Sequence, residues 1–212
     1  MGTLQHKERL LRKLKLNNGG GATVEWIDRY FDPEAGSYVN NEDGRTSDAI
    51  VHDDLKAAMA TLAEHLAIAC EMVPDPKGNY AFDGTTKGLE KFSVGSVVIR
   101  GGISDPDSPE EPSPLQVFIF GNKRLKTGHK CNFGTYGIKL GAPQEPYKFV
   151  SFLDGHVHQV IGEAMAYLDG KHSPPAQQAM DFQDRDPNAG ADIQLNALPE
   201  HEDDAVPAED GQ

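Results

Sequence analysis

The chain has few of the features that mark a secreted or a membrane protein. Only two of its 212 residues are cysteines, Cys70 and Cys131, so we expect no disulfide framework and a reducing compartment. No apolar run approaches the roughly 20 residues that a membrane span needs, and no apolar segment follows the N-terminal bases as in a signal peptide. We therefore expect a soluble cytoplasmic protein without membrane contact.

The motifs of the common catalytic sites are also missing. The chain has no Gly-x-Ser-x-Gly, no Walker loop, no dinucleotide-binding glycine motif and no His-Glu-x-x-His. His156 and His158 would point about 200° apart on a helix, which does not suit one shared metal ion. Cys131 follows His129 and Lys130, which favour a thiolate, but no partner base is evident. We expect no enzyme, cofactor or metal.

What the chain does have is an uneven distribution of charge. The net charge is −13, and residues 181–212 hold ten acids and one base, whereas residues 115–144 hold no acid. Five bases and four aromatic residues alternate in that acid-free stretch: Lys123, Arg124, Lys126, Lys130, Lys139, Phe118, Phe120, Phe133 and Tyr136. Such a combination is more typical of a protein that binds a polyanion or another protein than of an enzyme.

Hydrophobic periodicity predicts two long helices and four strands. Apolar residues recur three and four apart from Val51 to Val73, after a cap at Ser47 or Asp48, and again from Val150 to Leu168, before Gly170. The predicted strands cover residues 22–31, 92–100, 115–120 and 130–140. Residues 3–16 suggest a short basic amphipathic helix, residues 32–44 a polar loop, and the proline-rich residues 103–114 a mobile hairpin loop.

These elements predict an α+β fold. A curved antiparallel sheet of about four strands would pack against two amphipathic helices, in the order strand–helix–strand–strand–strand–helix. Residues 1–21 would form a basic arm with a glycine hinge, 22–172 a single domain, and 173–212 a disordered acidic tail, because the tail has too little apolar surface to fold.

The basic and aromatic stretch is the candidate functional site. Bases at a strand turn can neutralise phosphates, and aromatic side chains on a sheet can stack on unpaired bases. The same stretch also suits an ordinary solvated turn whose aromatic residues face the core. The predicted nucleic-acid-binding residues are Lys123, Arg124, Lys126, Lys130 and Lys139, with Phe133 and Tyr136 as stacking residues.

A basic aromatic sheet followed by an acidic tail resembles, in outline, the single-stranded DNA-binding proteins. That resemblance implies a tail that competes with nucleic acid for the basic surface or recruits a partner. Two features depart from that family: the chain ends in Ala208-Glu209-Asp210-Gly211-Gln212 without an aromatic tip, and about four strands are found where the family has a five-stranded barrel.

A second resemblance spans residues 92–171. The segments FSVGSVVIRGG, LQVFIFGNKRLKTG and EAMAYLDGK are similar to those of small uncharacterised phage and prophage proteins that tend to be encoded among replication and recombination genes. The resemblance implies an accessory protein of DNA metabolism in a bacterial host cell, which binds single-stranded nucleic acid or a DNA-processing protein.

Two alternatives from other classes remain open. The chain could be an acidic inhibitor that imitates DNA and binds a host protein, which the net charge favours but the concentration of acids in the tail does not. It could also be a structural protein that forms a homo-oligomer through an exposed part of either long helix.

Overall fold

A computed structural model describes residues 4–74, 88–105, 108–142 and 145–174 of the chain. The residues up to Pro174 form one compact unit. The elements are β1 (Gln5–Leu16), β2 (Ala22–Asp32), β3 (Ser37–Ser47), α1 (Asp53–Ala69), η1 (Leu89–Lys91), β4 (Phe92–Arg100), β5 (Ser104–Asp105), β6 (Ser108–Pro112), β7 (Gln116–Arg124), β8 (Lys130–Gly134), β9 (Ile138–Lys139) and α2 (Val150–Leu168). The predicted acidic tail lies outside the described residues.

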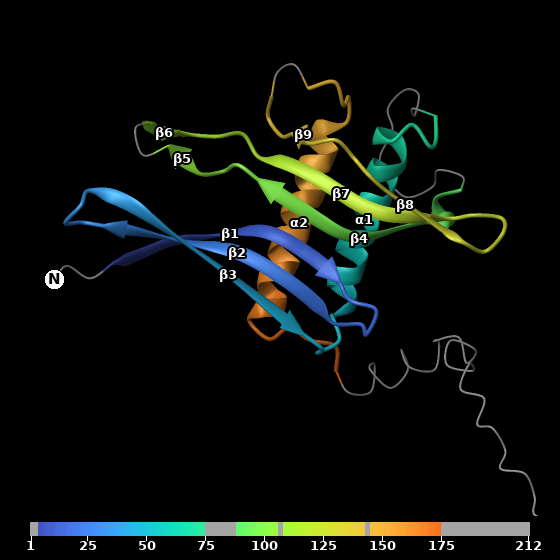
Figure 1. The fold of residues 1–212 in the computed structure, drawn as a ribbon, viewed down its shortest axis with the longest axis horizontal. Coiled ribbons are helices and arrows are strands. Elements are labelled where there is room, and N and C mark those ends of the chain that lie inside the picture. The colour runs from blue at the N-terminus through green and yellow to red at the C-terminus, as the bar shows by residue number, and fades with distance from the viewer. Residues whose placement is uncertain (1–3, 75–87, 106–107, 143–144, 175–212) are drawn as a thin grey trace, which may run out of the picture. The chain divides into compact units, whose positions relative to one another are not determined.

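The fold is α+β, as the sequence predicts. Seven of the strands form one antiparallel sheet in the order β3-β2-β1-β4-β7-β8, with β9 also paired to β7. β4, β7 and β8 are neighbours in the sheet and contain the last three predicted strands, which here form an antiparallel meander. Both helices lie on one side of the sheet, and β1, β2 and β3 continue past them as a twisted ribbon (Figure 1).

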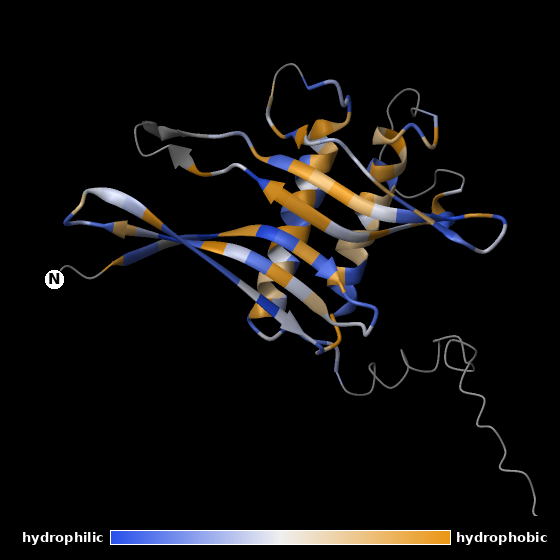
Figure 2. Ribbon diagram, viewed as in Figure 1, coloured by the Kyte–Doolittle hydropathy of each residue, from blue (hydrophilic) through white to orange (hydrophobic). Residues whose placement is uncertain are grey.

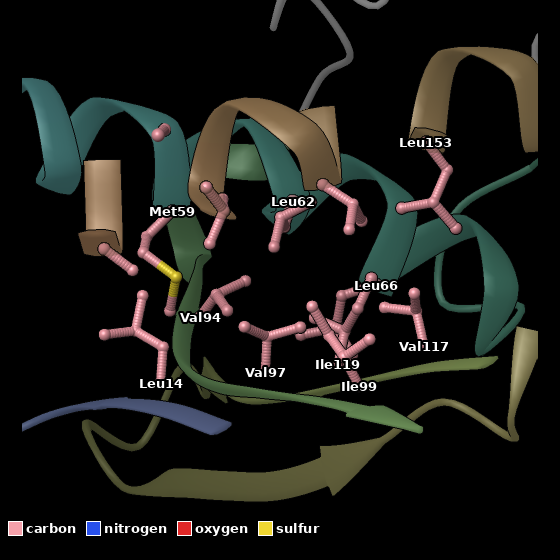
Figure 3. Close-up of a cluster of buried hydrophobic side chains, with 14 of the residues drawn as sticks. Leu14, Met59, Leu62, Leu66, Val94, Val97, Ile99, Val117, Ile119 and Leu153 are labelled. Atoms are coloured by element: carbon pink, nitrogen blue, oxygen red, sulfur yellow. The ribbon is translucent and has the colours of Figure 1, made fainter. Parts of the chain in front are cut away.

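The hydrophobic core lies between the helices and the sheet. Apolar residues gather on the helices and the middle of β4 and β7 (Figure 2). Met59, Leu62 and Leu66 of α1 lie over Val97 of β4 and Ile119 of β7 (Figure 3), and all five side chains are buried. These side chains recur three and four apart on the helix and two apart on the strands, so one face of each element is apolar.

The prediction of a helix near the N-terminus is wrong. Gln5–Leu16 is instead an interior strand of the sheet, paired with β2 and with β4. A bulge at Arg12 shifts the register, so that Leu11 and Leu14 are both buried although they are three residues apart. That spacing imitates the periodicity of a helix. The predicted glycine hinge is the turn between β1 and β2, closed by a hydrogen bond from the Gly20 amide to the Asn17 carbonyl.

Two segments predicted as loops also contain strands. β3 pairs with β2 over eleven residue pairs without a register shift, although nearly all of its side chains are exposed. In the proline-rich segment, β5 and β6 form a separate two-stranded sheet. The predicted hairpin is present, but its arms are paired strands.

The helix ends match the prediction at one helix and differ at the other. α2 spans Val150–Leu168, and Gly170 follows it with a φ of 102°, a conformation that glycine adopts without strain. α1 starts later than predicted, because His52 is its N-cap and accepts a hydrogen bond from the Asp54 amide at Nδ1. Ser47 instead ends β3, and its hydroxyl accepts from the Ala49 amide.

A network of hydrogen bonds ties β1 to β2 within the ribbon. Asp28 is buried and accepts from Arg9 Nε at 2.7 Å, from Arg9 Nη2 at 2.9 Å and from Trp26 Nε1 at 3.0 Å. The hydrogen bond from Arg9 is the main reason that the pKa of Asp28 falls to about 2. Ionisation of this carboxylate therefore stabilises the ribbon.

Candidate nucleic-acid interface

The face of the sheet away from the two helices, which we call the open face, can be assigned from the register. A Cβ atom on Gly121 would meet Leu66 of α1, so position 121 faces the helices and its neighbours along β7 face away. Cross-strand partners share a face. On β1 after its bulge and on β4, β7, β8 and β9, the open-face side chains are Lys13, Lys15, Ser93, Ser96, Val98, Arg100, Gln116, Phe118, Phe120, Asn122, Arg124, Lys130, Asn132 and Lys139. Thr23 and Glu25 of β2 share the face as partners of Lys15 and Lys13.

Two rows of this face each place a lysine and a phenylalanine on either side of β4. One row is Lys15–Ser96–Phe120 and the other is Lys13–Val98–Phe118. With strands about 4.8 Å apart, lysine and phenylalanine Cα atoms in a row are separated by about 10 Å. Each row therefore offers a cation for a phosphate and a ring for a base.

The two rows differ in whether their lysine and phenylalanine side chains already contact other charged groups of the protein. The ammonium group of Lys13 lies 2.6 Å from the Glu25 carboxylate, and the Arg100 guanidinium lies 5.1 Å from the centre of the Phe118 ring. Lys15 is exposed and makes no ion pair within the described residues, and Phe120 is 42% exposed. The Lys15–Phe120 row is the one open to a ligand.

Glycines on the neighbouring chain segment give both rings room to lie against the sheet. A Cβ atom on Gly134 would come within 2.5 Å of Cδ1 of Phe120, and one on Gly137 within 2.7 Å of Cζ of Phe118. An aromatic ring packed over a cross-strand glycine covers backbone that would otherwise face water. The rings thus lie over β8 and the segment that follows it.

A shallow hollow of about 720 Å³ surrounds the Phe120 ring. We call it the Phe120 hollow. Its lining includes Lys15, Ser96, Phe120, Asn122, Asn132 and Gly134. Asn122 and Asn132 are directly opposite each other on β7 and β8, and within the described residues neither amide side chain makes a hydrogen bond. A cation, a ring and two free amides therefore converge on one hollow.

Four of the predicted basic residues lie on or next to the open face. Arg124 and Lys130 are cross-strand partners at one end of it, and Lys139 lies at the other end opposite Gln116. All three side chains are exposed and unpaired within the described part of the chain. Lys126 is exposed in the turn between β7 and β8. A role of these four residues in nucleic-acid binding stays a prediction.

The other three predicted residues lie elsewhere. Lys123 and Phe133 share the side of the sheet that faces the helices: the Lys123 ammonium lies 5.0 Å from the centre of the Phe92 ring, and Phe133 contacts the same ring edge-on. The Tyr136 hydroxyl donates to Glu145, and burial together with this bond raises the pKa of Tyr136 to about 12. The structure does not bring these three side chains to the open face.

Sequence reasoning missed seven open-face residues as members of the site: Lys13, Lys15, Arg100, Phe118, Phe120, Asn122 and Asn132. The alternation Lys13-Leu14-Lys15-Leu16 is a strand signal, but the leucine spacing just before it favoured a helix. Phe118 and Phe120 alternate with Val117 and Ile119, so both faces of β7 are apolar and the sequence alone does not say which faces the core.

A hydrogen bond between two histidines, His65 of α1 and the half-buried His156 of α2, links the helices. His65 is fully buried, and its ring nitrogens are hydrogen-bonded to the Tyr147 hydroxyl at 2.7 Å and to Nδ1 of His156 at 2.9 Å. Burial, with a smaller contribution from His156, lowers the pKa of His65 to about 3. His158 bonds instead to Asp154. Among the described residues, no group of three or more His, Cys, Asp or Glu side chains is placed to hold a metal ion.

A larger hollow of about 800 Å³ lies on the other side of the sheet, between α1 and the start of β4. Its lining is mainly apolar and includes Met59, Leu89 and Phe92. Its lining has no side-chain amide, and the cation that it contains, Lys56, is paired with Asp53 and accompanied by Glu64 and Glu90.

Comparisons with known proteins assign no family to this fold. No protein-family model matches the chain, and neither a curated protein nor a solved structure does. The resemblances to phage proteins and to single-stranded DNA-binding proteins therefore stay predictions. Neither described helix is long and apolar enough to cross a membrane.

Proposed function

We propose that this protein is a non-enzymatic accessory protein of phage-type DNA metabolism that binds single-stranded nucleic acid on the open face of its sheet. One observation carries the proposal. The open-face positions of β4, β7, β8 and β9 hold four cations and no acid, and the cations flank two aromatic rings. Cations that follow a phosphate backbone, with rings on which bases stack, are the two parts used by sequence-tolerant single-strand binders.

An unpaired strand fits this face better than a duplex. Phe118 and Phe120 lie two residues apart on β7, so their Cα atoms are separated by about 6.8 Å. Paired bases in a duplex are stacked on each other and offer no free face to a flat sheet. A single strand can turn its bases onto the rings and leave its phosphates at the lysines.

The experiment is fluorescence anisotropy with labelled single- and double-stranded oligonucleotides at low salt. A variant with Lys15, Arg124 and Lys130 all changed to Gln should lose most of its affinity for the single strand. Arg124→Gln alone, with Lys123→Gln as its matched control, compares the loss of one charge from opposite faces of β7. Unchanged binding by the triple variant would refute the proposed interface.

The same measurement on a chain that ends at Phe182 tests the acidic tail. If the tail competes for the basic face, its removal should tighten binding, because a tethered polyanion has a high effective concentration. Absence of binding by either version, with tight binding to a host DNA-processing protein, would favour the inhibitor alternative.

A second candidate function is self-association, which the exposed ring of Phe120 favours. In that case the open faces of two copies would cover each other. Sedimentation velocity separates the two functions: a dimer that dissociates on Phe120→Ser and binds no oligonucleotide supports self-association, whereas a monomer that binds single strands excludes it.

A further inference from the structure

We infer that the Phe120 hollow is a pocket for one nucleotide, in which a base lies on the ring, its edge meets Asn122 and Asn132, and its phosphate meets Lys15. The inference rests on the proposed function and deepens it. At one position of the bound strand, the protein would contact the edge of the base, which stacking and charge alone do not do.

Stacking on Phe120 does not require the two amide side chains, Asn122 and Asn132, that lie beside the ring. Asn122 lies two residues beyond Phe120 on the same face of β7, about 6.8 Å along the strand. Asn132 is its cross-strand partner, with Cβ atoms about 5 Å apart. A primary amide offers a donor beside an acceptor, and every nucleobase presents donors and acceptors in its plane. Two such amides at the border of an aromatic ring suit the edge of a stacked base.

The surroundings of the ring leave space for that base. Gly134 opposes Phe120 on β8, and the absence of a side chain there lets the ring lie against the sheet, where it borders the hollow. Ser96 separates Phe120 from Lys15 and is too small to fill the space between them. The cation is thus in reach of a phosphate whose base lies on the ring.

Charge favours a nucleotide over an uncharged ligand such as a sugar, which also stacks on aromatic rings. Lys15, Arg124 and Lys130 all lack an ion-pair partner within the described residues, and Glu25, the acid of this region of β2, is already paired with Lys13. A ligand without a phosphate would leave these cations unused. The shared chemistry is a nucleoside 5′-phosphate, either free or as one residue of a strand.

The test follows the side-chain amide signals of Asn122 and Asn132 by two-dimensional nitrogen–proton NMR of the full chain, assigned with the Asn122→Ala and Asn132→Ala variants. The probes are oligo(dT), the four deoxynucleoside 5′-monophosphates, and deoxyribose 5-phosphate, which lacks a base. Both signals should shift with the oligonucleotide and not with the sugar phosphate. A shift at similar concentrations of mononucleotide would identify a free nucleotide as the ligand, and a shift with the oligonucleotide alone would identify a strand.

Affinities of variants give a second readout. Phe120→Ala should weaken oligonucleotide binding roughly 5- to 150-fold, the range for one stacked base, and each Asn→Ala change roughly 2- to 12-fold. Phe118→Ala is the matched control with a smaller loss, because Arg100 already covers that ring. Oligonucleotide binding that leaves both amide signals in place would overturn the pocket and keep the proposed function. Absence of any oligonucleotide binding would overturn both.

Discussion

The salt dependence of binding can be calculated from the charges on the open face. Lys15, Arg124, Lys130 and Lys139 are exposed and have no ion-pair partner within the described residues. If each neutralises one phosphate of a single strand, the logarithm of the affinity should fall with the logarithm of salt at a slope of about −2.8. Affinity should then drop about 50-fold between about 50 and about 200 mM salt.

The assay is a titration of a labelled single strand at several salt concentrations, with the triple variant of Lys15, Arg124 and Lys130. Loss of three contacts should reduce the slope to about −0.7, so that the same change in salt costs only about 2.6-fold in affinity. Lys123→Gln should keep the full slope. A slope that falls as much in Lys123→Gln as in a single open-face variant would refute the assignment of faces.

Three further predictions concern stability and are measured by urea unfolding. The pKa of Asp28 is lower in the folded chain than in the unfolded chain, so its ionisation contributes on the order of 2 kcal/mol to the free energy of unfolding. This contribution should be lost as pH falls from about 4 to about 2. Asp28→Asn should not show this loss. As pH falls, His65 takes up a proton near pH 6.5 in the unfolded chain but only near pH 3 in the folded chain. The free energy of unfolding should therefore decrease as pH falls from about 6.5 to about 3, and His65→Gln should flatten this part of the profile. An unchanged profile would contradict the assignment. Gly121→Ala would place a Cβ atom against the Ser93 carbonyl and Leu66 and should destabilise by about 1–3 kcal/mol or more, whereas Gly155→Ala, with nothing within 4 Å, should stabilise α2 by up to about 1 kcal/mol.

The parts of the fold that could be predicted are those that bury a regular apolar stripe. α2 was predictable from Val150 to Leu168 because its buried residues recur three and four apart and Gly170 follows. β4 was predictable for the same reason at a spacing of two, since Val97 and Ile99 are both buried. In such elements, local sequence and tertiary burial favour the same structure.

The elements that were not predicted are those whose buried residues do not follow the regular spacing of their secondary structure. β3 buries almost no side chain, and its backbone pairing with β2 leaves no periodic trace in the sequence. In β1, the bulge at Arg12 changes the spacing of buried leucines from two to three. A bulge depends on the partner strand as well as on the strand itself, so the sequence of β1 alone does not predict it.

The candidate site shows the same limit at the level of single residues. Lys123 and Arg124 are adjacent and chemically alike, yet only Arg124 is on the open face, because a strand turns successive side chains to opposite sides. A shift of one residue in register would exchange them. The sequence predicted the strand but ended it at residue 120, whereas β7 continues to Arg124 and the turn follows it. It also could not divide the basic residues between the two faces.

The choice of residues along β7 supports the proposal that the open face binds a ligand. Val117 and Ile119 fill the core under the helices, where branched side chains pack closely, whereas Phe118 and Phe120 are placed where water reaches them. Keeping an aromatic ring in water forgoes about 25 cal/mol for each Å² left unburied. Gly134 lets Phe120 recover part of that area by lying over the backbone, but 42% of the residue stays exposed. The open face thus has an exposed ring, unpaired cations around it and two free amides beside it. Folding does not require this combination. A ligand that stacks on a ring, carries a phosphate and has polar edges explains it better.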